Sequence, residues 1–204
     1  YGRTPPCVDV ILKKKIKKVY YAFEDPDLRT FKKAKKILNS KGVQTKLIRS
    51  KKYSKFYKSY FYNKKFSLPY IAAKIALSKD FFSINKKNKW ITNQTSRKIV
   101  HLLRNKYDCI LSTSKSINKD NSLLNCRLEG FDNYKPDLVI IDRNLNLKKK
   151  LKLFNISNKR KTYIVTTSKN AKKISFFKFK RIKVIQLDSL KYKKDFDLLF
   201  QILF

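Results

Sequence analysis

The sequence predicts an α/β protein whose strands pair in parallel, and three observations lead to this fold class. Short runs rich in valine and isoleucine recur along the chain at lengths typical of buried strands. Segments with apolar residues at helical spacing alternate with these runs. Turn signals such as Glu24-Asp25-Pro26 and Gly42 separate the two kinds of segment. This alternation is typical of β-α-β units, in which helices join parallel strands.

Two helices and two strands are expected before Lys51. Pro5 and Pro6 precede the first helix, and proline is tolerated in the first turn of a helix. Gly42 stands where the C-terminal cap of the second helix would lie. The expected elements are a helix over 8–15, a strand over 19–23, a helix over 31–39 and a strand over 43–48.

The segment 51–65 combines lysines with aromatic residues on one helical stripe. Aromatic rings beside lysines can stack on nucleic-acid bases. At helical spacing such a stripe is more often the face that a helix buries on its neighbour, and we favour this interpretation. The aromatic residues of the stripe are Tyr53, Phe56, Tyr57, Tyr60 and Phe61.

A domain boundary is expected near residue 65, which gives a first domain over 1–64 and a second over 65–204. Pro69 opens a new apolar run, and the alternation of strands and helices resumes after a loop over 78–89. The expected strands are 70–77, 109–112, 138–142, 163–167 and 183–187, and the expected helices are 93–105 and 195–203.

The chain has 204 residues and a formal net charge of +37, from 51 Lys and Arg against 14 Asp and Glu. Such a charge favours binding to phosphates, because basic side chains release the counterions of a nucleic acid. Nucleic-acid readers, however, group their charge and depend on arginine, whereas arginine supplies only nine of these residues and lysine is spread through every segment. We therefore attribute the charge to a compositional bias. With 42% hydrophobic residues the chain can still build a core.

Localisation is predicted from what the sequence contains. It has no apolar run of bilayer-spanning length and no pattern of a secretory signal, so we expect a soluble, cytoplasmic protein. The three cysteines, at positions 7, 109 and 126, do not form a disulfide framework, which agrees with a reducing compartment. The sequence starts at Tyr1 and contains no methionine, so we expect it to be a piece of a longer protein.

The opening heptapeptide, Tyr1-Gly2-Arg3-Thr4-Pro5-Pro6-Cys7, points to a specific chemistry. A thiolate at a helix N-terminus is favoured by the helix dipole and is a good zinc ligand, although a lone cysteine is usually structural. The string resembles the end of the zinc motif in the bifunctional riboflavin-biosynthesis deaminase/reductase family, and the resemblance continues in order to about residue 142. Its further landmarks are Glu24-Asp25-Pro26, Pro69-Tyr70-Ile71, Lys74, Ala76, Ser78, Asp80, Lys89-Trp90-Ile91-Thr92, Arg104, Ser116, Asp120, Leu124 and Arg127.

The resemblance implies a fold class and two activities. The fold would be α/β, with the C-terminal part of a cytidine-deaminase-like domain followed by an incomplete dihydrofolate-reductase-like domain. The first domain would hydrolyse an exocyclic amine of a phosphoribosylated diaminopyrimidine with a zinc-activated water. The second would reduce the ribosyl group to ribityl with NADPH. The implied partners are this small-molecule substrate and a second copy of the reductase domain.

The resemblance also assigns residues to the two sites. Cys7 would be a zinc ligand, and the His-x-Glu and Pro-Cys that complete the site would precede Tyr1; His101, on a predicted helix, is no substitute. Arg104 and Arg127 would hold the ribose phosphate, because a planar guanidinium binds an anion through two parallel hydrogen bonds. Asn88 and Leu124 would line the same site. The NADPH-binding residues would be Ala76, Trp90, Thr92, Ser116 and Asp120.

The sequence departs from the family pattern near the cofactor. Phe81 replaces the glycine of a Ser-x-Asp-Gly turn, the loop before Trp90 is shorter, and Arg143 stands where a small residue is common. The glycine-rich segment that contacts cofactor phosphates in the family would follow Phe204. We therefore expect no catalytic residue in this sequence and no activity of this piece alone.

Two alternatives stay open. A basic nucleic-acid-binding module would use the lysines and the aromatic stripe, and would retain DNA or RNA in a strongly salt-dependent way. A degenerate paralogue would keep the fold without turnover.

Overall fold

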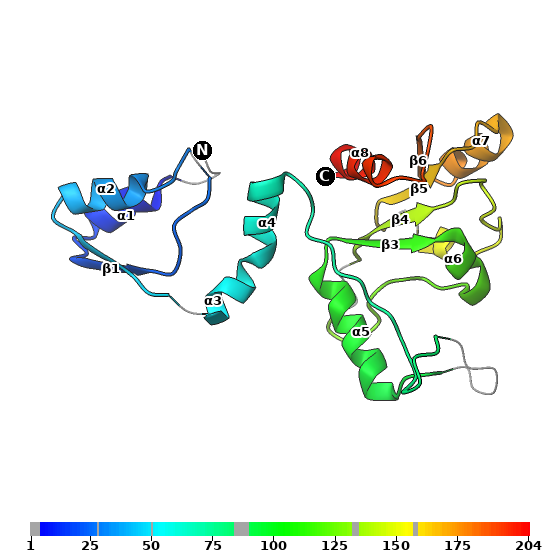
Figure 1. Ribbon diagram of the computed structural model, residues 1–204, viewed down its shortest axis with the longest axis horizontal. Helices are drawn as coiled ribbons and strands as arrows, with labels where there is room; N and C mark the ends of the chain where they lie inside the picture. Colours follow the sequence, from blue (N-terminus) through cyan, green and yellow to red (C-terminus); the bar gives the residue numbers. More distant parts are fainter. Residues whose placement is uncertain (1–4, 28, 50, 84–89, 132–134, 157–158) are drawn as a thin grey trace. The chain divides into compact units, whose positions relative to one another are not determined.

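The computed structural model describes residues 5–27, 29–49, 51–83, 90–131, 135–156 and 159–204 (Figure 1). These residues divide into two compact units. The first comprises Tyr1–Ala72 and Asp197–Phe204, and the second comprises Ala73–Phe196. The domain limits expected from the sequence, 1–64 and 65–204, stay predictions.

The first unit confirms the expected order of helix, strand, helix, strand. Its two strands pair in parallel, with Lys18 opposite Gln44. Val8, Leu38 and Val43 form a small buried cluster that connects the two helices with the segment before the second strand. The elements are α1 (Cys7–Lys13), β1 (Lys18–Tyr21), α2 (Lys33–Ser40), β2 (Gln44–Leu47), α3 (Lys51–Phe56) and α4 (Lys58–Phe66).

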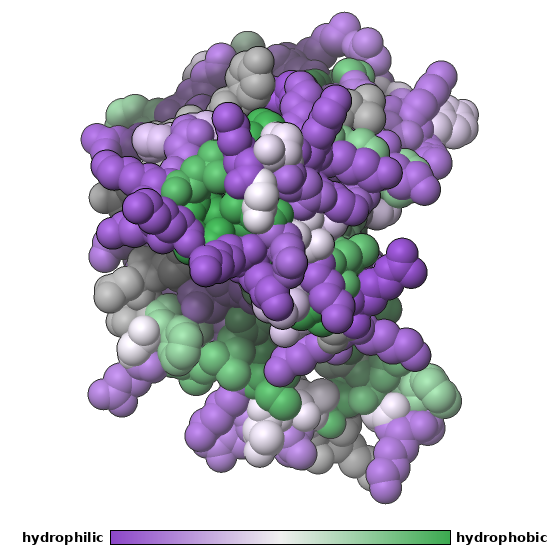
Figure 2. Space-filling model, turned by 90° about the vertical axis from the view of Figure 1, so that its left-hand side faces the viewer, coloured by the Kyte–Doolittle hydropathy of each residue, from purple (hydrophilic) through white to green (hydrophobic). Residues whose placement is uncertain are grey.

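Four residues of the aromatic stripe lie on α3 and α4, and Tyr57 lies between the two helices, so the stripe is not carried by one helix as its spacing predicts. Neither helix buries a residue. Only Phe61 is half-buried, where the ring of Phe23 meets it edge-on at a centroid distance of 5.1 Å. Phe56 is 79% exposed. The expectation of a buried face is therefore wrong for most of the stripe. Figure 2 shows hydrophilic side chains spread over most of the face that it draws, with hydrophobic patches between them.

One hydrogen bond and one ion pair attach α4 to the turn after β1. The Tyr60 hydroxyl donates to Asp25 Oδ1 over 2.8 Å, and Lys64 Nζ lies 3.1 Å from Asp27 Oδ2. The hydrogen bond to Asp25 raises the pKa of Tyr60 to about 12. Partial burial raises the pKa of Asp25, but hydrogen bonds from the Asp27 amide, Tyr60 and Thr30 outweigh it and lower that pKa below its ordinary value.

Tyr60→Phe should therefore lower the free energy of unfolding in a pH-dependent way. The raised pKa of Tyr60 means that its contribution is complete below the ordinary tyrosine pKa of 10 and is lost as the pH rises through about 12. Because the pair is exposed, we expect a loss of less than about 1 kcal/mol at pH 7. Denaturant unfolding at pH 7, 9 and 11 measures it, with Tyr62→Phe as control; a loss that is the same at all three values contradicts the assignment.

The second unit is built on a parallel sheet with the strand order β3-β4-β5-β6. Cys109 lies opposite Asp137, Leu138 opposite Thr162 and Tyr163 opposite Lys183. The predicted strands near 109, 138, 163 and 183 and the two predicted helices are thus confirmed. The elements are α5 (Gln94–Lys106), β3 (Cys109–Thr113), α6 (Ser114–Asp120), β4 (Asp137–Ile141), the 3-10 helix η1 (Lys152–Ile156), β5 (Thr162–Thr166), α7 (Ala171–Phe179) and β6 (Lys183–Gln186). The last helix, α8 (Lys193–Leu203), begins in this unit, and its residues from Asp197 onward belong to the first unit.

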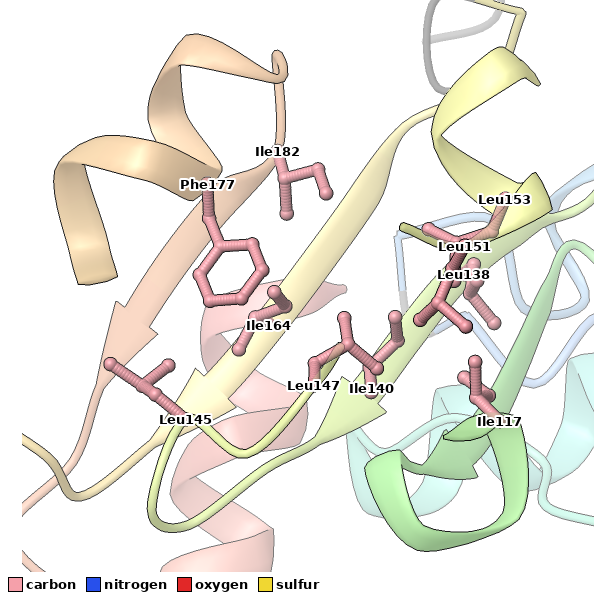
Figure 3. Close-up of a cluster of buried hydrophobic side chains, with 10 residues drawn as sticks. All are labelled: Ile117, Leu138, Ile140, Leu145, Leu147, Leu151, Leu153, Ile164, Phe177 and Ile182. Atoms are coloured by element: carbon pink, nitrogen blue, oxygen red, sulfur yellow. The ribbon is translucent and has the colours of Figure 1, made fainter. Parts of the chain in front are cut away.

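The hydrophobic core of the second unit forms against the middle strands. Figure 3 shows side chains from α6, β4, η1, β5 and α7 that point toward one another. Leu138 and Ile140 of β4 and Ile164 of β5 are fully buried, because the central strands of a parallel sheet are covered on both faces. The remaining members are Ile117, Leu145, Leu147, Leu151, Leu153, Phe177 and Ile182.

The strand expected over 70–77 is absent from the structure. The segment has no regular secondary structure, and Ile71 and Ile75 are 61% and 70% exposed. A strand forms only where its backbone donors and acceptors find a partner strand, and no described strand pairs with this segment. The apolar run therefore predicted a strand that this chain does not form.

Phe177 and Phe179 provide a matched test of the core, because both lie on α7 and only one is buried. Phe177 is 2% exposed and Phe179 is 82% exposed. We expect Phe177→Ala to lower the free energy of unfolding by about 3 to 5 kcal/mol and Phe179→Ala by less than about 0.5 kcal/mol, as measured by denaturant unfolding. Equal effects would show that α7 does not pack as described.

Candidate functional site

The carboxyl ends of the four parallel strands lie at one edge of the sheet, where α/β proteins commonly bind their ligands. Asp142 follows β4 at this edge and is buried. Its carboxylate accepts hydrogen bonds from the Ser114 hydroxyl at 2.9 Å and from the amides of Asn146 and Leu147 at 2.9 and 2.8 Å. This carboxylate therefore holds the turn after β4 and joins it to the start of α6.

Ser116 and Asp120 lie on α6, which begins directly after β3. The Thr113 side chain caps this helix by accepting from the Ser116 amide. Because the two residues are four positions apart, they lie on one face of the helix, and both are exposed, whereas Ile117 is fully buried. The structure thus places Ser116 near the start of α6, directly after β3, and Asp120 at the end of the same helix.

Trp90 and Thr92 lie at the start of α5, where Arg97 connects them. The Arg97 guanidinium lies 4.6 Å from the centroid of the Trp90 ring and donates to the Thr92 carbonyl over 2.6 Å. The Asn93 side chain caps α5 by accepting from the Ser96 amide. The predicted NADPH residues therefore form two groups, one on α6 and one before α5.

Two further predicted residues have a less defined place. Ala76 is half-buried in the segment between α4 and α5 that has no regular secondary structure. Asn88 lies outside the described residues.

The predicted substrate residues Arg104, Leu124 and Arg127 come together at the end of α5. Arg104 Nη1 donates to the Asn125 carbonyl over 3.1 Å. One turn earlier on the helix, His101 Nδ1 accepts from the Arg127 amide over 3.2 Å. The end of α5 is thus hydrogen-bonded to the segment that carries the other two residues.

The electrostatics of this group favour an anion. Burial lowers the pKa of Arg104, and the charge of Arg127 lowers it further. Burial likewise lowers the pKa of His101, with Arg104 and Arg127 acting in the same direction. Two guanidinium groups that repel each other are stabilised by a ligand with negative charge, and their planar donors suit phosphate oxygens.

Sequence reasoning gave no role to two residues that hold this group together, His101 and Arg160. Arg160 is buried and donates to the carbonyls of Leu123 and Leu124. Both bind main-chain atoms, which leave no trace in a residue pattern. The one available signal is that Arg160 is an arginine in a chain where lysine is the usual basic residue.

Cys7 is the first residue of α1 and is exposed, as expected for a cysteine at a helix start. The part of the chain that the structure describes contains no cluster of three or more His, Cys, Asp or Glu residues that could hold a metal. These residues therefore do not fit a zinc centre by themselves, and Cys7 stays a predicted ligand. No helix of the described segments is long and apolar enough to cross a membrane.

Comparison with known families gives a match to the RibD C-terminal domain over residues 69–201. The chain belongs to this family. It is 32% identical to the riboflavin biosynthesis protein RibD of Bacillus amyloliquefaciens over 72% of this chain and 40% of that protein. It is 28% identical to RibD of Aquifex aeolicus over 95% of this chain and 54% of that protein. The chain thus spans about half the length of the curated relatives that it matches.

Solved structures of the family confirm an α/β fold with a parallel sheet like that of the RibD reductase. One is a diaminohydroxyphosphoribosylaminopyrimidine deaminase/5-amino-6-(5-phosphoribosylamino)uracil reductase from Thermotoga maritima, with a TM-score of 0.81 and 24% identity over all of this chain and 55% of that chain. Another is RibD of Acinetobacter baumannii, with a TM-score of 0.79 and 23% identity over all of this chain and 55% of that chain.

Phe81, where the resemblance places the glycine of a Ser-x-Asp-Gly turn, has a left-handed backbone with φ of 65°. The turn keeps its hydrogen bonds, since the Phe81 amide donates to the Ser78 carbonyl over 3.0 Å and the Phe82 amide donates to Ser78 Oγ over 2.9 Å. A side chain in this conformation costs about 1 kcal/mol, and at 81% exposure the phenyl ring returns little through burial.

We therefore expect Phe81→Gly to raise the free energy of unfolding by up to about 1 kcal/mol, less the entropy that glycine adds to the unfolded chain. Phe81→Ala is the control, because it removes the ring and keeps the strain. Denaturant unfolding of the three proteins measures the effect; an alanine variant as stable as the glycine variant would contradict the assignment of strain.

Proposed function

We propose that the protein to which this chain belongs catalyses the reductive step of riboflavin biosynthesis, in which the ribosyl group of a phosphoribosylaminopyrimidine becomes a ribityl group. Membership of the RibD C-terminal domain family supports this reaction class. The observation that carries the substrate assignment is the meeting of Arg104, Leu124 and Arg127 at the end of α5. Two arginines at one place match the phosphate that this substrate carries.

NADPH is the proposed reductant, and when bound it supplies the hydride. The residues fit a dinucleotide: Ser116 is exposed near the start of α6, directly after β3, and Trp90 is 58% exposed, with the Arg97 guanidinium over its ring. We assign contacts with the cofactor to Ala76, Trp90, Thr92, Ser116 and Asp120.

The residues of this chain align the reactants, and no acid or base is assigned among them. Arg104 and Arg127 anchor the substrate through its phosphate, while Asn88 and Leu124 line the same site. A lowered pKa keeps His101 neutral, so its Nδ1 remains an acceptor for the Arg127 amide. Such positioning lowers the barrier to hydride transfer by reducing the loss of orientational freedom in the transition state.

A zinc-dependent deaminase that precedes the reductase in the same protein is the second part of the proposal. It would occupy the chain before this sequence and end within 1–64, with Cys7 as one zinc ligand. The reductase would occupy 65–204 and continue beyond it, so that this piece alone is inactive. We further propose a cytoplasmic homodimer formed through the reductase domain.

One observation favours the alternative of nucleic-acid binding, because aromatic rings of α3 and α4 stay exposed beside lysines. Single strands bind to such surfaces by stacking and charge. Retention on single-stranded DNA that falls steeply between low and physiological salt, together with no NADPH oxidation in the presence of substrate, would favour this alternative over the reductase.

Arg127→Lys in the full-length protein tests the substrate assignment. Lysine keeps the charge and loses the paired donors, so we expect KM for the phosphorylated substrate to rise about tenfold while kcat changes little. NADPH oxidation at 340 nm measures both constants.

The control variant is Arg181→Lys, since Arg181 is exposed in the same unit. A dephosphorylated substrate gives a second control, because it should bind wild type and variant equally. If Arg127→Lys leaves KM for the phosphorylated substrate unchanged, Arg127 is not a phosphate ligand.

A further inference from the structure

In the segment Leu123–Arg127, three main-chain carbonyls and one main-chain amide form hydrogen bonds with side chains from elsewhere in the unit. We call this stretch the 123–127 segment. Arg160 Nη1 donates to the Leu124 carbonyl over 2.9 Å, and its Nη2 donates to the Leu123 carbonyl. Arg104 donates to the Asn125 carbonyl, and His101 accepts from the Arg127 amide. The path of the backbone is thus fixed from the residue before Leu124 to Arg127.

Arg160 is unusual because its charged side chain is buried. Only 8% of the residue is exposed, and burial lowers its pKa to about 10, with the charge of Asp137 acting in the opposite direction. Its Nε is buried and has no hydrogen-bond partner among the residues that the structure describes. Burying a charge is costly, and here the compensation comes from the negative charge of Asp137 and from two main-chain carbonyls. The hydrogen bonds of the guanidinium join Arg160 to the 123–127 segment.

That shape is strained, and so depends on outside support. Leu124 has a left-handed backbone with φ of 50°, which a side chain with a Cβ adopts only at a cost. Both carbonyls that Arg160 binds belong to the peptides that enter and leave Leu124. The planar fork of one guanidinium holds two acceptors in a fixed relative direction, which a lysine cannot do.

We propose that Arg160, assisted by His101, is a positioning residue for substrate binding: it fixes the 123–127 segment so that Leu124 and Arg127 meet the phosphate-bearing substrate together with Arg104. Arg160 does not touch the substrate; it acts through the backbone. The claim that Arg160 fixes the 123–127 segment stands on the structure alone. The claim that this serves substrate binding rests on the proposed function, because the position of Arg127 matters only if Arg127 binds the substrate.

Two measurements on the full-length protein test the proposal, with Arg160→Lys as the variant and Arg181→Lys as the matched control. Hydrogen–deuterium exchange of peptides that cover 121–128 reports whether the segment loosens. Steady-state kinetics with the phosphorylated substrate report whether its position matters. We expect exchange in these peptides at least about tenfold faster, and KM about tenfold higher with kcat within about threefold of wild type, in the Arg160 variant and not in the control.

A purely structural role for Arg160 predicts a different pattern, in which exchange rises throughout the second unit and kcat falls through loss of folded protein. A second variant, Arg160→Met, keeps the length of the side chain and removes all donors, and should shift KM further in the same direction.

Each outcome tests a different part of the proposal. Unchanged exchange at 121–128 in Arg160→Lys overturns the positioning role whatever the kinetics show. Faster exchange with unchanged KM shows that Arg160 holds the segment but overturns the claim that this serves the substrate. If wild type does not reduce the substrate at all, the proposed function fails, and the exchange data still decide whether Arg160 fixes the segment.

Discussion

Hydrogen bonds from arginine side chains to main-chain carbonyls connect the loops of the second unit with one another. Arg104 reaches a carbonyl 21 residues away, Arg160 reaches carbonyls 36 and 37 residues away, and Arg143 reaches the Leu190 carbonyl 47 residues away. A loop that leaves a parallel sheet has few backbone partners of its own, so its buried carbonyls need donors from elsewhere. The guanidinium supplies several donors at the end of a long side chain.

This use of arginine is informative because the composition works against it. Lysine dominates the basic residues, and exchanging arginine for lysine preserves charge at exposed positions. At a carbonyl clamp the exchange fails, because one ammonium cannot hold two acceptors in a plane and is more strongly hydrated, so that its burial costs more. The arginines that persist near the end of α5 and before β5 therefore mark positions where geometry matters and charge alone does not suffice.

The sheet of the second unit was predictable because the composition of its strands is typical of buried strands. Valine and isoleucine form the centre of the runs 138–142 and 163–167, as expected for strands buried on both faces, and β4 and β5 lie within one residue of these limits. The run over 70–77 is also apolar, but it contains three alanines and only two isoleucines, and no described strand pairs with it. The short helix α6 was missed because a single buried residue, Ile117, gives no periodicity.

The candidate site divides in the same way. Arg104, Leu124 and Arg127 were predictable from a resemblance, and the structure brings them together. Their support was not predictable, since His101 and Arg160 bind the main chain, and a backbone carbonyl is the same at every residue. Sequence patterns thus report which side chains a site needs, whereas the groups that hold the backbone become visible only when distant segments are placed side by side.

The repulsion within the site links its stability to its ligand. Burial lowers the pKa of both His101 and Arg104; the charges of Arg104 and Arg127 lower that of His101 further, and the charge of Arg127 does the same to Arg104, so the ligand-free arrangement has an electrostatic cost. The hydrogen bonds to the carbonyls of Leu123, Leu124 and Asn125 offset this electrostatic cost in the ligand-free protein. In the proposed substrate site, a bound anion would regain energy by neutralising charges that are already in place, and little entropy would be lost in ordering them. In a chain with a net charge of +37, where any lysine can attract an anion, it is this fixed geometry that distinguishes a binding site from the general attraction of the surface.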